Sequence, residues 1–166
     1  MIVVSNTSPI TSLSAIGYVN LLHDIYGTII IPSAVYEEMT HVGYAVPGTI
    51  EVTTLSWIEK RTLENRSLFE QLNHELHRGE SETIALAISL NTDRVIIDEN
   101  PGRKKAMSLG LNVMGILGIL LIAKRRRLIA AIQPLMDDLI LKAGFLVNQR
   151  LYLDLLRSAQ EIDENQ

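Results

Sequence analysis

Short apolar runs that alternate with helical segments limit the possible folds of this chain more than any other feature. The runs are rich in β-branched residues, and each is short and mostly apolar, as strands buried on both faces of a parallel sheet are. Four of them are strand candidates, at residues 2–5, 28–31, 94–97 and 112–114. Alternating strands and helices predict an α/β fold with a mainly parallel sheet and right-handed crossovers.

The segments between the strands carry helix signals. Ser8 offers an N-cap, Pro9 a proline at the first helical position, and Gly17 a stop. Further helix candidates cover residues 32–40, 68–76, 80–90 and 101–109, and Gly110 is expected to close the last of them. Residues 43–56, which include Pro47 and Gly48, are expected to form a loop with room for one edge strand.

The C-terminal part of the chain predicts helices only. They start at Ile116 and are interrupted near Arg127 and Gly144. The most apolar stretch, residues 113–123, is too short to cross a bilayer and predicts a buried strand end followed by a core helix. We expect residues 1–160 to form one domain and residues 161–166 to be a frayed acidic tail.

Composition excludes several classes of protein. The 166 residues suit one domain, and 47% hydrophobic with 20% charged residues indicate a chain that folds. A formal net charge of −4 argues against a surface coated with positive charge, although a local basic patch is still allowed. The absence of cysteine excludes disulfides, thiolate catalysis and a cysteine zinc site. The start of the chain lacks the features of a secretory signal, so we expect a cytoplasmic protein without a membrane segment.

Polar and acidic side chains follow two of the predicted strands and open two of the predicted helices. They are Ser5, Asn6, Thr7 and Ser8, then Asp98, Glu99 and Asn100, with Glu37, Glu38, Glu80 and Glu82 on the helices. Ligands of parallel α/β sheets bind outside the carboxyl ends of the strands. Carboxylates that converge there repel one another unless a divalent cation lies between them. Mg²⁺ or Mn²⁺ held in this way activates water and stabilises an in-line phosphoryl displacement.

Each of these residues also has a structural interpretation. Acidic residues in the first turn of a helix, such as Glu80 and Glu82, favour the helix dipole without any further role. Glu37 and Glu38 fit a solvated helix face, and residues 6–8 fit a turn and cap. Asp98 fits a cap of the helix after Pro101. For each residue taken singly, the structural interpretation is the stronger one. The convergence of all of them at one sheet edge favours a functional site.

Five motifs, in order and spacing, resemble the PIN-like family that is similar to the toxin component of VapBC-type toxin–antitoxin systems. They are SNTSPI, IPSAVYEEM, RGESETIALA, VIIDENPGRKKA and GLNVMGILGILLIAKRRRLI, and the resemblance runs from about residue 2 to about residue 155. It implies a three-layer α/β/α fold with a mainly parallel sheet and a helical C-terminal part. It also implies a metal-dependent ribonuclease that holds Mg²⁺ or Mn²⁺ through four acidic positions.

The resemblance assigns these positions residue by residue. The four metal and catalytic positions fall on Asn6, Glu38, Glu80 and Asp98, with Glu37 as the alternative to Glu38. Ser8 and Arg103 match residues that help to bind substrate and to position the first acid. The resemblance further implies an RNA substrate, a small antitoxin protein as partner and a homodimer.

Two positions depart from the family pattern. Asn6 stands where the family usually has aspartate, and Ile116 follows Gly115 where the family usually has threonine. An asparagine can ligate Mg²⁺ through its carbonyl oxygen but adds no negative charge and cannot act as a general base. Two alternatives therefore stay open beside an attenuated ribonuclease: a degenerate protein- or RNA-binding module, and a receiver-like phosphoryl-transfer domain that uses Asp98.

Basic residues occur near Asp98 and again after residue 123. Arg103 is one short turn from the predicted site, which favours a role at phosphates. Residues 124–127, KRRR, have a structural explanation at the C-terminal end of a helix. One Trp and two Phe do not support a base-stacking platform.

Overall fold

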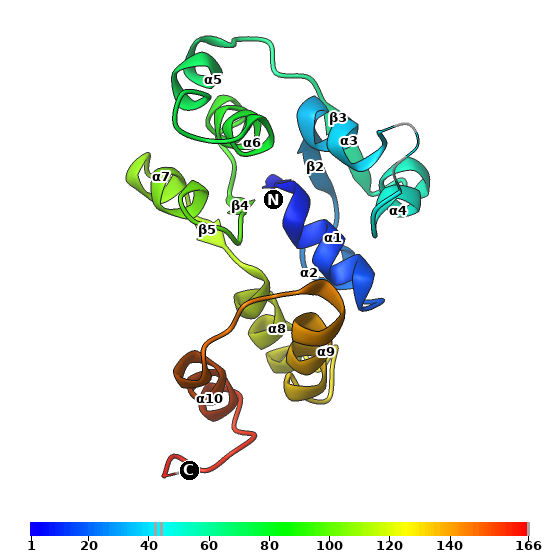
Figure 1. The fold of residues 1–166 in the computed structure, drawn as a ribbon, viewed down its shortest axis with the longest axis vertical. Coiled ribbons are helices and arrows are strands. Elements are labelled where there is room, and N and C mark those ends of the chain that lie inside the picture. The colour runs from blue at the N-terminus through cyan, green and yellow to red at the C-terminus, as the bar shows by residue number, and fades with distance from the viewer. Residues whose placement is uncertain (42, 44, 166) are drawn as a thin grey trace.

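Five short parallel strands form one sheet at the centre of the molecule (Figure 1). The structure is a computed structural model that describes residues 1–41, 43 and 45–165. The strands are β1 (Val3–Ser5), β2 (Ile29–Pro32), β3 (Ile58–Arg61), β4 (Arg94–Ile96) and β5 (Val113–Met114). Their order across the sheet is β3-β2-β1-β4-β5, and every pair is parallel. The predicted α/β fold with a parallel sheet is confirmed.

Helices cover both faces of the sheet. Successive strand residues point to opposite sides, so each strand contributes side chains to two separate cores. In β1, Val3 packs into one core and Val4 into the other, and both side chains are fully buried. The core around Val3 includes α1 (Thr7–Ala15), α2 (Asn20–Tyr26), α3 (Ser33–Met39), α4 (Thr49–Thr54), α8 (Ile116–Arg125), α9 (Gln133–Ala143) and α10 (Gln149–Ser158). The core around Val4 includes α5 (Ser67–Leu72), α6 (Arg78–Ser89) and α7 (Gly102–Ser108). Figure 1 shows α5, α6 and α7 on one side of the strands and α8, α9 and α10 on the other, which gives the three layers.

The four predicted strands are present with ends shifted by at most one residue, and the fifth strand falls outside the prediction. The segment 43–56 was expected to be a loop with at most an edge strand, but it contains α4, and the edge strand β3 follows it. Helix α2 was not predicted, and α5 ends at Leu72 instead of continuing to residue 76. Residue 44 of the predicted loop segment 43–56 lies outside the described residues, as does residue 42.

Helix α1 begins two residues earlier than the sequence suggests. Asn6, with an extended backbone, takes the N-cap position, and Ser8 is already helical. Pro9 therefore occupies the third helical position, where its missing N–H has no partner inside the helix to lose. As a result, the side chain of Asn6 comes directly after β1.

The C-terminal helices follow the prediction closely. In α8 the side chains of Ile116, Ile119 and Leu120 are fully buried, as expected of a core helix. The interruptions near residues 127 and 144 are confirmed: Arg127 (φ 61°) and Gly144 (φ 65°) both have left-handed backbones. Among the described residues no helix is both long enough and apolar enough to span a bilayer.

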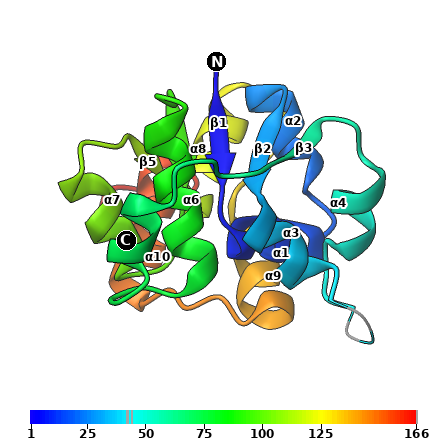
Figure 2. The same cartoon turned by 90° about the horizontal axis from the view of Figure 1, so that it is seen from above.

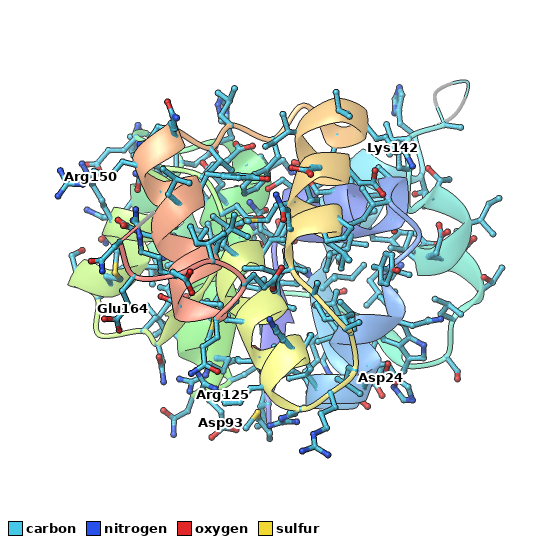
Figure 3. All side chains as sticks on the ribbon, turned by 90° about the horizontal axis from the view of Figure 1, so that it is seen from below. Asp24, Asp93, Arg125, Lys142, Arg150 and Glu164 are labelled. Atoms are coloured by element: carbon cyan, nitrogen blue, oxygen red, sulfur yellow. The ribbon has the colours of Figure 1, made fainter. Side chains whose placement is uncertain are left out.

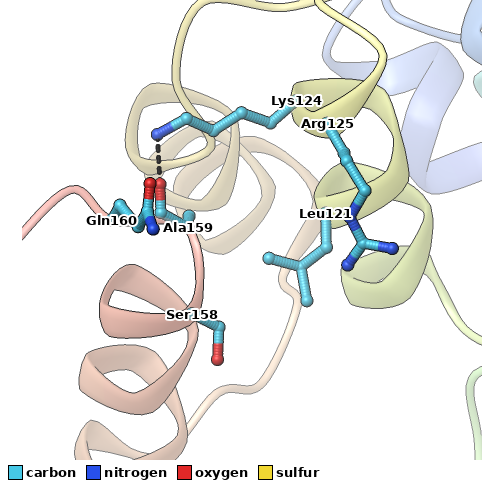
Figure 4. A pocket seen from close by; sticks show the side chains of 6 residues that line it. All are labelled: Leu121, Lys124, Arg125, Ser158, Ala159 and Gln160. Carbon is cyan, nitrogen blue, oxygen red and sulfur yellow. Dashed lines mark hydrogen bonds between the residues drawn. The ribbon is translucent and has the colours of Figure 1, made fainter.

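Glu161, the first residue of the expected tail, is held against the domain. Its carboxylate accepts hydrogen bonds from the backbone N–H of Ile132 (2.7 Å) and Gln133 (3.1 Å) at the start of α9. Lys124 Nζ lies 2.9 Å from the same carboxylate. Lys124 also donates to the carbonyl of Ala159, an interaction drawn in the view of the cavity between α8 and α10 (Figure 4). The chain is thus tied down at least as far as residue 161.

We expect Glu161→Gln to lower the free energy of unfolding by about 1–2 kcal/mol at pH 7, because charge-assisted hydrogen bonds are lost. Burial raises the pKa of Glu161, but the three N–H donors and the charge of Lys124 outweigh it, so its pKa lies below the usual value. Such a carboxylate stabilises the fold above its unfolded pKa, and this contribution is lost as the pH falls through the folded pKa. Urea denaturation at pH 7 and pH 3 measures both effects. Glu164→Gln, at an exposed position, is the control. An equal loss of unfolding free energy in both variants would contradict the role of Glu161 in holding the chain against α9.

Candidate functional site

The sheet reverses its strand order between β1 and β4. The chain runs from β1 outward through β2 to β3 and then returns to β4 on the other side of β1. Crevices at such switch points, outside the carboxyl ends of the strands, are the usual ligand sites of parallel sheets. Asn6 follows β1, and its N–H donates to the carbonyl of Ile96 in β4 (3.0 Å). Asp98 comes two residues after Ile96, so the switch point brings the ends of these two strands together.

Glu38 and Glu37 point to different surroundings. Glu38 accepts a hydrogen bond from the hydroxyl of Thr7 at the start of α1 (2.5 Å). Its carboxylate also packs against Gly79 at the start of α6, where a Cβ would collide with it. Glu37 instead pairs with Arg78 (2.8 Å), and both of these side chains are more than half exposed. Of the two, Glu38 is the residue that lies next to α1 and to the residue preceding Glu80.

The carboxylates of Glu80 and Glu82, two residues apart on α6, also lie in different surroundings. The Glu80 carboxylate lies over Gly102 of α7, where an added Cβ would be 3.0 Å from Glu80 Oε1. Thr83, one turn further along α6, has its hydroxyl 3.5 Å from Asn6 Oδ1, so this face of α6 borders the switch point. Glu82 is 1% exposed, accepts from the N–H of Ala34 (3.0 Å) and lies 3.5 Å from Arg66. Glu82 therefore ties α6 to the first turn of α3, and its carboxylate is occupied.

Asp98 caps a helix other than the one the sequence suggested. Its Oδ1 accepts from the N–H of Ile116 (2.7 Å) at the start of α8, not from α7. Its Oδ2 is buried and has no hydrogen-bond partner among the described residues. Gly115 makes the approach possible, because a Cβ there would lie 3.0 Å from Asp98 Oδ1 and 2.6 Å from an Arg103 nitrogen. Ile116 thus contributes its N–H to the site, while its side chain is fully buried in the core.

The electrostatics indicate crowded negative charge. Burial raises the pKa of Asp98 to about 6, against the N–H of Ile116 and the charge of Arg103, which lower it. Burial also raises the pKa of Glu80 against the N–H and the charge of His77, which lower it, and the charges of Glu99 and Glu38 add smaller increases. Carboxylates whose pKa values are raised in this way in a crevice are typical of functional sites.

Glu99 is the residue that sequence reasoning did not select. It is exposed, its charge acts on both Glu80 and Asp98, and it lines a cavity of about 530 Å³ beside Asp98. Its position directly after Asp98 at a strand end was the available signal.

Ser8 and Arg103, the two residues expected to bind substrate, differ in whether their polar groups already have hydrogen-bond partners. Ser8 lines the same cavity, and its hydroxyl is buried without a hydrogen-bond partner in the described part of the chain. Arg103 donates to the carbonyl of Ile97 (2.9 Å) and lies close to Asp98, so part of its guanidinium is already engaged. In this structure Arg103 balances the Asp98 charge and supports the loop that carries it.

A family model described as a PIN domain matches residues 2–161, nearly the whole chain. The chain belongs to the PIN-domain family. PIN domains are nuclease-type folds, so the comparison supports a hydrolase at this coarse level. Neither the curated proteins nor the solved structures contain a match to the chain. The matched range reaches Glu161, in agreement with the contacts that hold this residue against α9.

The residues of this PIN domain fit a divalent metal ion by their chemistry. The oxygens of Asn6, Glu38, Glu80 and Asp98 are ligands that Mg²⁺ and Mn²⁺ prefer. The unpartnered Asp98 Oδ2 and the raised pKa of Glu80 both leave room for a positive charge. Over the described residues, however, no three His, Asp or Glu side chains lie close enough to hold one ion. In this structure the Glu38 carboxylate is instead engaged by the Thr7 hydroxyl.

Glu80→Ala and Glu82→Ala are expected to have opposite effects in this PIN domain. Glu82→Ala should lower the free energy of unfolding by about 2–4 kcal/mol, because it leaves the Ala34 N–H unpaired and opens a cavity. Glu80→Ala should change stability by less than about 1 kcal/mol, because it also relieves charge repulsion, but it should weaken Mn²⁺ binding at least tenfold. Thermal denaturation and Mn²⁺ calorimetry on both variants measure this. The assignment fails if Glu82→Ala loses metal binding while Glu80→Ala keeps it.

Proposed function

We propose that this PIN domain is a Mg²⁺- or Mn²⁺-dependent endoribonuclease that cuts single-stranded or structured RNA. The observation that carries the proposal is the set of oxygen ligands around the switch point, with Asp98 Oδ2 buried and unpartnered. In nuclease-type folds such a set holds the metal ion that the chemistry needs.

Each side chain has a defined part in this proposal. Asp98, Glu80 and Glu38 would hold the metal, and Asn6 would add a neutral carbonyl oxygen from the end of β1. The bound metal would activate the attacking water and balance the charge that develops on the phosphoryl oxygens. Arg103 keeps the Asp98 loop in place, and the free hydroxyl of Ser8 can donate to a phosphate oxygen in the cavity.

The proposal includes a toxin-like role, with a small antitoxin protein as partner and a homodimeric, cytoplasmic enzyme. Its support is the resemblance of the five motifs to toxin-type PIN proteins. Exposed apolar side chains on α9 and α10 also support it: Leu141 is 82% and Leu151 41% exposed. Such side chains are suited to a protein interface.

One observation favours a second candidate, a PIN-like module that binds RNA or protein without cutting. Asn6 removes one of the four negative charges, and fewer carboxylates bind a divalent ion less tightly. A protein of this kind would bind RNA but show no metal-dependent cleavage.

Glu38→Gln and Glu37→Gln form a matched pair that tests the proposed function. The two residues are neighbours on one helix, both are exposed, and only Glu38 contacts the site. We expect Glu38→Gln to reduce Mn²⁺-dependent cleavage of a labelled RNA by at least tenfold and Glu37→Gln to leave it within about twofold. Equal cleavage by both variants would contradict the assignment of Glu38. The absence of cleavage in the wild type, together with RNA binding, would favour the non-catalytic module.

A further inference from the structure

A groove leads away from Asp98 between α1 and α9. The cavity of about 530 Å³ beside Asp98 is also lined by Ser8, Ser12 and the segment 143–146. A second cavity of about 330 Å³ shares Ser12 and Ala143 with it and ends at Lys142. Each lies in the range of about 300–1,000 Å³ that encloses a drug-sized ligand. Because the two cavities have these residues in common, they lie next to each other along α1, and together they define the groove.

The walls of the groove differ in chemistry along its length. Near Asp98, the hydroxyl of Ser8 is buried without a partner among the described residues. The opposite wall is apolar: Phe145 is partly buried against the core, whereas Leu146 is 94% exposed. Gly144, in a left-handed conformation, turns the chain after α9 so that these two residues line the cavity. Leu146 therefore offers apolar surface beside the polar end of the cavity.

A cation closes the far end of the groove. Lys142 is exposed, and its one ion pair within the described part of the chain is a long surface pair with Asp138 (3.6 Å), one turn earlier on α9. Such pairs contribute little, so the ammonium group is available to a phosphate. Figure 3 shows Lys142 at the opposite side of the molecule from Arg125, which closes α8.

We propose that this groove binds the single-stranded RNA that flanks the scissile phosphate, with Lys142 on a backbone phosphate and Leu146 against a base. The inference rests on the proposed function for the identity of the ligand. A nucleic-acid strand cut at Asp98 must leave the site, and the groove offers the hydroxyls of Ser8 and Ser12, an apolar wall and, beyond the exposed Glu99, the cation of Lys142. Phosphate contacts position the strand, and the apolar wall gives a base non-specific contact.

Fluorescence anisotropy with a short single-stranded RNA tests the groove. Ca²⁺ replaces Mn²⁺ so that the RNA is not cut. Lys142→Ala should weaken binding and lower the slope of log K against log salt by about 0.7, the value for one lost phosphate contact on a single strand. Arg125→Ala, which removes the same charge from the other side of the molecule, should leave the slope unchanged.

Leu146→Ser should weaken binding about threefold to tenfold without changing the salt slope, because it removes apolar contact only. Leu141→Ser is its control, since Leu141 is 82% exposed on the same helix end but lines neither cavity. The proposal is wrong if Arg125→Ala lowers the salt slope as much as Lys142→Ala does, or if Leu146→Ser and Leu141→Ser bind RNA with the same affinity. It is also wrong if the wild type binds no RNA.

Mn²⁺-dependent hydrolysis of a small phosphodiester, bis(p-nitrophenyl) phosphate, separates the two proposals. This substrate has no flanking nucleotides, so it lacks the backbone phosphate and the base that Lys142 and Leu146 are proposed to contact. Hydrolysis without the predicted RNA-binding pattern would overturn the groove and keep the nuclease. The predicted binding pattern without hydrolysis of either substrate would keep the groove and overturn the nuclease.

Discussion

Asp98→Asn is expected to abolish metal-dependent cleavage and, in the same protein, to raise the free energy of unfolding. Asparagine still accepts the hydrogen bond from Ile116 N–H, so the start of α8 keeps its cap. The amide adds no charge where the unpartnered Oδ2 now lies, and we expect cleavage to fall at least a hundredfold. A residue whose loss stabilises the fold while it removes activity is maintained for function.

The stability effect follows from the pKa of Asp98. The pKa of Asp98 is about 6 in the folded chain, above the ordinary value of 3.8 for an aspartate. Between these values the folded state binds more protons than the unfolded state, so stability falls as the pH rises from about 4 to about 6. Above pH 6 the chain carries a buried charge at a cost of roughly 3 kcal/mol in the extreme case. Asp98→Asn should recover about 1–2 kcal/mol of this, because the new amide N–H₂ is itself left unpaired.

Metal-free thermal denaturation at pH 5 and pH 8 measures this effect beside the cleavage assay. We expect the melting temperature of Asp98→Asn to be higher than that of the wild type at pH 8, and the difference between them to be smaller at pH 5. Added Mg²⁺ should raise the melting temperature of the wild type only. A variant that is less stable than the wild type at pH 8 and still cleaves RNA would contradict this assignment of Asp98.

Asn6→Asp is expected to increase Mn²⁺ affinity and the rate of RNA cleavage by about tenfold or more. The substitution restores a fourth carboxylate at the end of β1, and divalent-ion affinity rises with the number of charged ligands. In the absence of metal, the new charge would be 6% exposed, with the Thr83 hydroxyl as its neighbour, so the metal-free protein should be destabilised by about 1–3 kcal/mol. Saturating Mn²⁺ should reverse that loss.

Calorimetry, cleavage assays and thermal denaturation with and without Mn²⁺ measure these effects. Asn112→Asp is the control, because it adds the same charge before β5, at the opposite end of the strands. If Asn6→Asp and Asn112→Asp behave alike, Asn6 does not lie at the metal site. If Asn6→Asp binds Mn²⁺ more tightly but cuts no faster, metal affinity does not limit the reaction.

The fold was predictable where burial leaves a local signal. Strands β1, β2 and β4 are apolar over nearly their whole length because helices cover both of their faces. Strand β3, with the sequence IEKR, has only Ile58 buried and three exposed charged residues, so at the sheet edge it looks like a loop. Helix α2 has seven residues and α4 six, which is too short for a clear helical period.

The site was predictable in its position and only partly in its contacts. Strand ends with polar residues indicated the switch point, because parallel strands present their carboxyl ends at one edge. The role of Asp98 as the cap of α8 depends on Ile116, 18 residues later, and no local pattern shows it. The separation of Glu80 from Glu82 likewise depends on Ala34, which lies 48 residues earlier than Glu82. Contacts of this range require the folded chain.

Calorimetric titration of the purified protein with Mn²⁺ tests the central claim most directly, with Asp98→Asn and Glu37→Gln measured in parallel. If Asn6, Glu38, Glu80 and Asp98 form a metal site, the wild type and Glu37→Gln will bind Mn²⁺ alike and Asp98→Asn will bind at least tenfold more weakly. Equal binding by all three proteins, or no binding by the wild type at millimolar Mn²⁺, would contradict it.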